Sequence, residues 1–311
     1  MSLKPRISRL TLGTAQIGFK YGISNKEGKI PTNKAKEILR TAITNGITCF
    51  DTAPSYGESE RILGEFFSSN DQFQLPIIVT KLPQVIIQDK FKEKLVYNNV
   101  KKQLLSSTQK LRLNKIPVYL IHHPSNITDY KGQIIDALVR LREEQLVGRI
   151  GASIYTPDEA QSVLDNGKLT AIQLPFNIFD LRFITSGLLE ELEKQRFVIF
   201  ARSIFLQGLF FLNPEKLPKG LKTAQKPLNR LNEIALSENY SIAELALLFV
   251  KEQTEITSVV IGAETQDQIL ENIKIFTSPN SLSLNLKSEI MSTFVDLPEN
   301  LIEPRLWKLT L

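Results

Sequence analysis

The chain has 311 residues, of which 42% are hydrophobic and 23% are charged, so it can form a large core and is not a disordered polymer. Its 38 Lys and Arg residues outnumber its 33 Asp and Glu residues, which gives a formal net charge of +5. The basic residues are scattered rather than gathered in one stripe, which argues against a nucleic-acid-binding surface. This small excess favours at most anionic small molecules as ligands.

The sequence also predicts a cytoplasmic protein that does not enter membranes. Its N-terminal segment, MSLKPRISRL, lacks the apolar region of a signal peptide, and no stretch approaches the roughly 20 apolar residues of a membrane helix. The single cysteine, Cys49, has no partner for an intramolecular disulfide, which fits a reducing compartment. Because Cys49 stands in an apolar run, we expect it to be a small core residue.

Short apolar or β-branched runs recur along the chain, and each is followed by a longer segment of helical periodicity. We expect strands at residues 9–14, 47–51, 77–81, 118–122, 149–153, 171–174, 198–202 and 258–261. We expect helices near residues 33–45, 58–68, 91–111, 131–146, 157–166, 182–195, 225–253 and 266–276. This alternation is the pattern of repeated βα units around a parallel sheet.

Capping signals mark several helix ends. Thr156, followed by a proline and by Glu159, predicts a capping box, and Ser241 and Thr265 begin the same pattern. The signal at Ser241 indicates that the long seventh helical region is broken near Asn239. Helix stops that lead into strands are expected at Gly46 and Gly148.

Eight units without a linker fit a closed (β/α)8 TIM barrel of the α/β class, and we expect one domain over residues 1–311. An open doubly wound sheet is disfavoured, because the glycines of residues 13–18 lack the GxGxxG spacing after the first strand. Residues 212–227 and 298–311 are predicted to be loops. Loops after barrel strands form the active face, so residues 212–227 are a candidate substrate lid.

Three successive predicted strands deliver reactive side chains to this face. The second ends on Asp51 and is followed by Tyr56, the third ends on Lys81, and the fourth ends on His122. Taken singly, each could be a capping, packing or solvated strand-end residue. Neighbouring strands lie about 4.8 Å apart, so the side chains can converge on one pocket, and together they indicate an active site.

Residues 46–64, which contain Asp51 and Tyr56, resemble the signature of the aldo-keto reductase family. Lys81 and His122 fall where that family places its other catalytic residues, and the similarity extends over nearly the whole chain. His122 is chosen over His123 because the family histidine stands two residues before a proline. The resemblance implies an NAD(P)-dependent carbonyl reductase or alcohol dehydrogenase without a Rossmann domain.

The chemistry explains these residue types. Hydride addition leaves negative charge on the carbonyl oxygen, and Tyr56 is the candidate proton donor. Lys81 is expected to lower the pKa of this phenol, while Asp51 holds the lysine and partly neutralises it. His122 is expected to orient the substrate oxygen, whereas His123 lines the pocket or faces the helices.

The resemblance also implies contacts to the nicotinamide end of the cofactor. Ser153 and Gln173 match residues that bind the carboxamide, although Ile154 replaces an asparagine, and Ser153 could simply be a turn residue. Arg202 replaces an aromatic residue that stacks on the nicotinamide, and it could stack there itself or recognise an anionic substrate. Two further residues, Gln207 and Gly208, resemble the pyrophosphate-binding stretch, with a simple turn as the alternative for Gly208.

At the adenosine end, Gly262, Ala263 and Gln268 stand where the family often has Lys, Ser and Arg for the 2′-phosphate of NADP. NADP is slightly favoured by the resemblance, but Glu264 could select a free ribose hydroxyl, so NAD stays open. The remaining expected cofactor contacts are Gly13, Thr14, Asp51, Glu271 and Asn272.

Within the family, the segments around Tyr21 and Arg202 resemble a bacterial branch associated with surface polysaccharides and unusual sugars, which favours a carbonyl or sugar substrate. Trp307 could cover the pocket or belong to the core. Two alternatives stay open, namely a redox-sensing barrel with little turnover and a lyase that uses Lys81 as a Schiff-base nucleophile. No metal is expected, and the protein is expected to be a monomer or a weak homo-oligomer.

Overall fold

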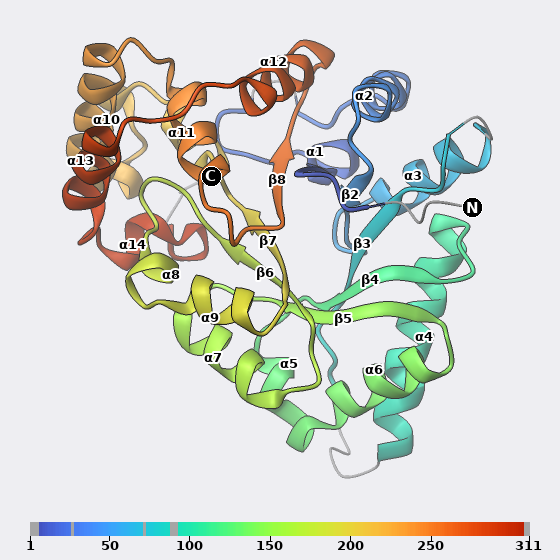
Figure 1. The fold of residues 1–311 in the computed structure, drawn as a ribbon. Helices are drawn as coiled ribbons and strands as arrows, with labels where there is room; N and C mark the ends of the chain where they lie inside the picture. Colours follow the sequence, from blue (N-terminus) through green and yellow to red (C-terminus); the bar gives the residue numbers. More distant parts are fainter. Residues whose placement is uncertain (1–5, 26–27, 71–72, 88–92, 308–311) are drawn as a thin grey trace.

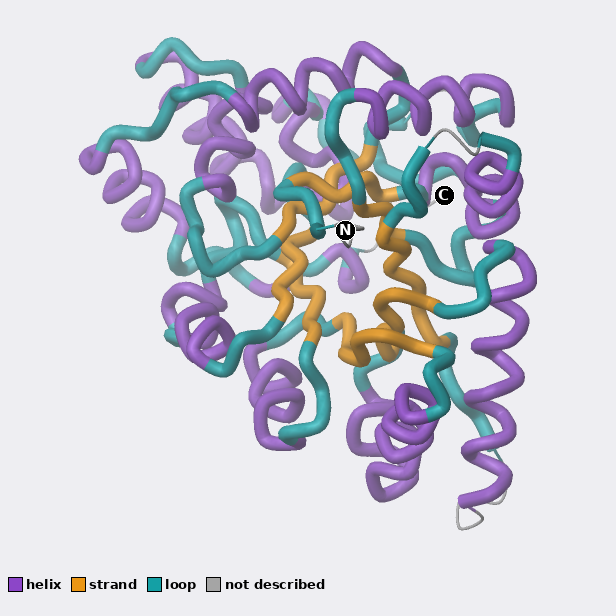
Figure 2. The backbone as a smooth tube through the Cα atoms, turned by 45° about the vertical axis from the view of Figure 1, so that its right-hand side comes forward, coloured by secondary structure: helices purple, strands orange, loops and turns teal. Residues whose placement is uncertain are grey.

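The computed structural model of the chain describes residues 6–25, 28–70, 73–87 and 93–307. Eight parallel strands pair in chain order and close into a barrel, because β1 pairs with both β2 and β8 (Figure 1). The strands are β1 (Leu10–Gly13), β2 (Cys49–Asp51), β3 (Ile77–Leu82), β4 (Ile116–Ile121), β5 (Val147–Ser153), β6 (Ala171–Pro175), β7 (Val198–Arg202) and β8 (Ser258–Gly262). The predicted (β/α)8 barrel is confirmed, and Figure 2 shows its ring of strands inside a layer of helices.

The helices of the outer layer follow the predicted alternation. They are α2 (Thr32–Thr44), α3 (Ser59–Ser68), α4 (Glu93–Leu111), α6 (Gln133–Glu143), α7 (Pro157–Asn166), α9 (Leu188–Lys194), α10 (Gln225–Ser237), α11 (Ile242–Lys251), α12 (Gln266–Thr277) and α13 (Leu284–Phe294). Short helices are α1 (Ala15–Gly18), α5 (Ser125–Thr128), α8 (Arg182–Thr185) and α14 (Glu299–Ile302). The predicted start of the third helix at residues 91–92 lies outside the described residues. Among the described residues, no helix is long and apolar enough to cross a membrane.

The apolar core has two parts. A small cluster that includes Cys49, Val79 and Phe200 consists of strand residues and fills the inside of the barrel. A much larger cluster lies between the strands and the helices. Cys49 is fully buried, as expected for a core residue.

Most of the predicted helix ends are confirmed. Thr156 and Ser241 form complete capping boxes, and Asn239, with φ +56°, separates α10 from α11. Thr265 accepts the Gln268 backbone N–H, but the Gln268 side chain instead accepts the backbone N–H of Glu264, so this capping box is only half formed.

The prediction of a helix stop was right for Gly46 and wrong for Gly148. Gly46, with φ +89°, follows α2, whereas Gly148 lies inside β5. A Cβ at position 148 would be 2.4 Å from the carbonyl oxygen of Pro117, so this glycine allows β5 to approach β4 closely. The chain turns instead at Gln145, which has φ +61°.

Two predicted loops and one predicted helix also differ from the structure. The candidate lid contains 3₁₀ turns at Pro214–Lys216 and Lys219–Ala224, and residues 182–195 divide into α8 and α9. The C-terminal segment forms α14 and a 3₁₀ turn at Pro304–Leu306, while residues 308–311 lie outside the described ones. Trp307 is buried in the core, and its Nε1 donates a 3.0 Å hydrogen bond to the carbonyl of Leu301.

Candidate active site

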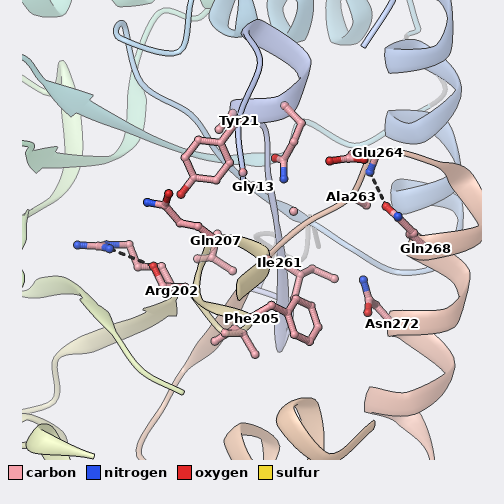
Figure 3. Close-up of a pocket in the computed structure, with 18 of the residues that line it drawn as sticks. Gly13, Tyr21, Arg202, Phe205, Gln207, Ile261, Ala263, Glu264, Gln268 and Asn272 are labelled. Atoms are coloured by element: carbon pink, nitrogen blue, oxygen red, sulfur yellow. Dashed lines mark hydrogen bonds between the residues drawn. The ribbon is translucent and has the colours of Figure 1, made fainter. Parts of the chain in front are cut away.

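A cavity of about 490 Å³ lies at the carboxyl ends of the strands, among the loops that follow β1, β7 and β8 (Figure 3). The predicted residues that line it are Gly13, Thr14, Asp51, Tyr56, Arg202, Gln207, Gly208, Gly262, Gln268, Glu271 and Asn272. The other predicted residues are not part of its lining: Lys81, His122 and Gln173 contact Asp51 or Tyr56, and Ser153 contacts Gln173. The structure therefore brings the predicted set together around one cavity.

Asp51 and Lys81 form a buried ion pair between β2 and β3. The Lys81 Nζ donates to both carboxylate oxygens of Asp51, at 2.7 and 2.9 Å, and to the carbonyl of Thr52 at 3.0 Å. Lys81 is fully buried. Burial lowers the pKa of the Lys81 ammonium, and the Asp51 charge opposes this effect and holds the proton on the lysine.

Tyr56 lies against this pair, with the Lys81 Nζ 5.0 Å from the centre of its ring. Burial, followed by the charge of Asp51, raises the pKa of the Tyr56 phenol, while the charge of Arg202 opposes the rise. The pKa of this phenol is therefore raised overall, in contrast to the lowering expected from Lys81. The physical reason is that Asp51 compensates the lysine charge, so the loss of water around the phenol has the larger effect.

The second neighbour of Tyr56 is His122, whose ring centre lies 6.0 Å from that of Tyr56 at an interplanar angle of 85°. Burial, with the charges of Lys81 and Arg202, lowers the pKa of His122 to about 3. His122 is thus a neutral imidazole near pH 7. His123 is exposed and does not line the cavity, and its Nδ1 lies 3.1 Å from the Ser125 hydroxyl.

Gln173 and Ser153 extend the polar chain across the inside of the barrel. The Gln173 Nε2 donates a 2.7 Å hydrogen bond to the Asp51 carboxylate, and the Ser153 hydroxyl donates to the Gln173 side-chain oxygen at 3.4 Å. Both residues are buried. Of the two residues expected at the nicotinamide carboxamide, Gln173 thus bonds directly to Asp51, and Ser153 is connected to it through Gln173.

The loops after β1 and β7 meet over the cavity. The Ile23 backbone N–H donates to the carbonyl of Gln207 at 2.9 Å. Gly208 has φ +90°, and a Cβ there would be 2.1 Å from the Ser24 hydroxyl. Gly208 is thus needed for both its backbone conformation and the close approach of the two loops.

Several residues that line the cavity were not among the predicted site residues, and they include Gln16, Tyr21, Ser24 and Phe205. Figure 3 shows Tyr21 directed toward Gln207. Burial, followed by interaction with Tyr56, raises the pKa of Tyr21 to about 12. The barrel topology could have identified three of these four residues as site candidates, because Gln16, Tyr21 and Ser24 follow β1, on the active face.

The ends of the cavity differ in charge. Arg202 lies on the opposite side from Glu264 and Gln268 (Figure 3). Glu264 and Glu271 line the adenosine end predicted from the sequence, where the Gln268 side chain accepts the Glu264 backbone N–H at 2.7 Å. This cavity has a size typical of cofactor sites, and its amide, hydroxyl and guanidinium groups fit a nicotinamide dinucleotide.

Among the described residues, no group of three or more His, Cys, Asp or Glu could hold a metal ion.

Comparison with known proteins agrees with this architecture. Residues 9–283 match the profile of the aldo/keto reductase family. The NADH-specific methylglyoxal reductase of Escherichia coli (strain K12) is 25% identical to the chain over 323 residues, which cover 95% of this chain and 96% of that protein. The uncharacterized oxidoreductase YqkF of Bacillus subtilis (strain 168) is 25% identical over 279 residues, which cover 85% of this chain and 89% of that protein.

Solved structures share the fold. The glycerol dehydrogenase AKR11B4 from Gluconobacter oxydans has a TM-score of 0.72 and 21% identity, with 95% of each chain covered. The holo form of the aldo-keto reductase AKR11C1 from Bacillus halodurans has a TM-score of 0.74 and 19% identity, with 96% of each chain covered. With the family match over most of its length, the chain belongs to the aldo/keto reductase family.

Proposed function

We propose that this protein is a nicotinamide-dependent reductase that converts a carbonyl compound to an alcohol, with Tyr56 as the general acid. One observation carries the proposal: Tyr56 lies beside both the Asp51–Lys81 ion pair and His122, and lines the same cavity as Asp51. This arrangement places three useful groups together. Tyr56 can donate a proton, the charge of Lys81 can stabilise negative charge that develops nearby, and the neutral His122 ring can form a hydrogen bond.

The bound nicotinamide would supply the hydride that adds to the carbonyl carbon. Because its pKa is raised, Tyr56 keeps its proton at neutral pH and can give it to the carbonyl oxygen as negative charge develops there. The Lys81 ammonium stabilises the phenolate that remains, and Asp51 fixes the position of the lysine. Neutral His122 donates a hydrogen bond to the substrate oxygen and orients it.

We further propose that NADH is preferred over NADPH, contrary to the slight preference for NADP implied by the family resemblance. Glu264 and Glu271 would repel a 2′-phosphate at the adenosine end. The backbone N–H of Glu264 is already bonded to Gln268, so it is not available to a phosphate oxygen. The name of the Escherichia coli relative, an NADH-specific reductase, supports this direction.

We propose a small, polar carbonyl compound or a sugar as the substrate. The supporting points are the sequence resemblance to the sugar-related branch and the names of a methylglyoxal reductase and a glycerol dehydrogenase among similar proteins. Cofactor and substrate would have to share this cavity of about 490 Å³, which favours a small substrate.

The test is a calorimetric titration of the purified protein with NADH and with NADPH, followed by a panel of aldehydes, ketones and sugars. We expect tighter binding of NADH and oxidation of the cofactor over many turnovers when a carbonyl is added. Binding with only a single turnover would favour the redox-sensing alternative, and binding of neither cofactor would overturn the proposal. Reduction with borohydride in the presence of substrate should leave Lys81 unmodified, which separates this function from the lyase alternative.

A further inference from the structure

Arg202 has an unusual environment for a cation. It stands at the end of β7, is partly buried, and is the one lysine or arginine that lines the cavity within the described part of the chain. Its guanidinium donates to the carbonyl of Ile154 at 3.0 Å and to the Ser203 hydroxyl at 3.2 Å. Both acceptors are uncharged, so they orient the guanidinium without balancing its charge.

Two neighbouring arginines show the contrast. Arg182 makes two 2.8 Å hydrogen bonds to Asp180, and Arg305 forms an ion pair with Glu303. For Arg202, no carboxylate lies within ion-pair distance among the residues that the structure describes. A partly desolvated cation of this kind is stabilised by any anion that can reach it.

The side chain of Tyr155 brings two of these cations together. The Arg202 Cζ lies 4.4 Å from the centre of the Tyr155 ring, and the Arg305 Cζ lies 3.4 Å from it. The tyrosine ring stabilises both guanidinium groups by cation–π contact and limits the directions in which Arg202 can turn. Arg202 is therefore held in place beside the cavity by Ile154, Ser203 and Tyr155.

Arg202 is also close to the reacting groups. It lines the same cavity as Tyr56, and its charge lowers the pKa of Tyr56, Lys81 and His122. A ligand that places a carbonyl at Tyr56 can thus reach Arg202 with a second functional group. The remaining N–H groups of the guanidinium match the two oxygens of a carboxylate or phosphate.

Building on the reductase function proposed above, we propose that the substrate is an anionic carbonyl compound whose carboxylate or phosphate binds Arg202 while its carbonyl lies at Tyr56 and His122. Arg202 is then a specificity residue. The chemistry shared by the two anions is a pair of oxygens that accept parallel hydrogen bonds from one guanidinium.

The test compares matched substrates that differ in one anionic group. The pairs are butanal with succinic semialdehyde, for the carboxylate, and glyceraldehyde with glyceraldehyde 3-phosphate, for the phosphate. We expect the kcat/KM of the wild type to favour one anionic member by about 10- to 100-fold, as charge-assisted hydrogen bonds allow. Arg202→Gln should reduce this ratio to about one, mainly by raising the KM for the anionic substrate, and Arg202→Lys should restore part of it.

Arg305→Gln is the matched control, because it also removes a guanidinium that contacts the Tyr155 ring. Unlike Arg202, Arg305 has its charge balanced by Glu303. It should leave the preference for the anionic substrate in place. Loss of that preference in Arg305→Gln, with no effect of Arg202→Gln, would overturn the assignment to Arg202.

A binding measurement separates this inference from the reductase function. Calorimetry with succinate and with inorganic phosphate should show binding of one of them to the wild type in the presence of NADH, and loss of it in Arg202→Gln. If this holds without turnover of any aldehyde, the anion site stands and the reductase function fails. If butanal and succinic semialdehyde are reduced equally well, as are the two glyceraldehydes, and neither anion binds, the function stands and the anion site fails. Weaker NADH binding in Arg202→Gln with unchanged anion binding would assign the residue to the cofactor instead.

Discussion

Gly18 lies so close to Tyr56 that a Cβ at position 18 would be 1.6 Å from the carbonyl oxygen of Tyr56. Gly57, with φ +56°, contributes to the same contact, since a Cβ there would be 2.5 Å from the carbonyl oxygen of Gly18. The end of α1 and the loop that carries Tyr56 are thus in direct backbone contact. Gly18 is a positioning residue for the phenol, because only a hydrogen atom fits between the two segments.

Gly18→Ala is expected to displace the Tyr56 loop. A shift of about 1 Å in a reacting group can reduce turnover on the order of 100-fold, so kcat should fall strongly while calorimetry still detects NADH binding. The control is Gly167→Ala, at a glycine with φ +67° and open space around it, which should lower stability without affecting kcat. Unchanged kcat in a folded Gly18→Ala protein would contradict the positioning role.

Tyr56→Phe removes the proposed proton donor and keeps the aromatic ring. We expect kcat to fall about 10²- to 10⁴-fold, with nearly unchanged affinity for NADH in a calorimetric titration. Full turnover in this variant would rule out Tyr56 as the general acid.

The Asp51–Lys81 pair predicts an asymmetry between single and double variants. Lys81→Met leaves the Asp51 carboxylate buried without its cation, which should lower the free energy of unfolding by about 3–5 kcal/mol. The double variant Asp51→Asn, Lys81→Met should recover much of this loss, because no unpaired charge remains, yet stay inactive. Urea unfolding and kcat measurements on the three proteins test this. A double variant as unstable as Lys81→Met would show that the loss comes from packing rather than from the unpaired charge.

The low pKa of His122 makes stability depend on pH. The unfolded histidine binds a proton below about pH 6.5, whereas the folded one binds it only near pH 3, so between these values acid favours unfolding. The free energy of unfolding should therefore fall as the pH drops below about 6.5, by at most about 1.4 kcal/mol per pH unit from this residue.

His122→Gln tests this dependence, because glutamine has no proton to gain. Urea unfolding at pH 7.5, 5.5 and 4.5 should show a smaller loss of stability in the variant than in the wild type. Equal losses in both proteins would mean that the folded His122 titrates near its ordinary pKa.

Gln268→Arg is expected to change the cofactor preference. It removes the acceptor of the Glu264 N–H and supplies a cation for a 2′-phosphate, so the affinity for NADPH should rise about 10-fold relative to NADH. Gln266→Arg is the control, since Gln266 bonds to Glu37 and Thr41 and does not line the cavity. A similar gain in both variants would reflect general charge attraction rather than a contact at position 268.

The sequence was sufficient to predict the barrel and to predict that the candidate catalytic residues lie close together. Asp51, Lys81 and His122 each stand at the end of an apolar strand, and strand order alone brings such residues to one face. Gly148 was misassigned because a glycine that allows two strands to approach has the same local sequence context as a glycine that ends a helix. The helix α13 was not predicted because it follows the eighth βα unit and does not belong to the repeat.

Properties that depend on residues far apart in the sequence, such as pKa values and ion pairs, could not be predicted from the sequence. The raised pKa of Tyr56 reflects how completely the folded chain removes water from the phenol. Among the described residues, no carboxylate forms an ion pair with Arg202, and the nearby acids Asp180 and Glu303 pair with Arg182 and Arg305 instead. Periodicity reports which side of an element is buried, but not which charges meet across the barrel.

The hydrogen bond from Gln173 to Asp51 joins β6 to β2, from opposite halves of the closed ring. During folding, the first half of the chain alone would contain Asp51, Tyr56, Lys81 and His122 but would lack this partner and the loops after β7 and β8. Catalytic competence should then arise late, after the last strand docks on the first, and not in proportion to the amount of strand already formed. The architecture thereby makes the appearance of activity a marker of complete assembly.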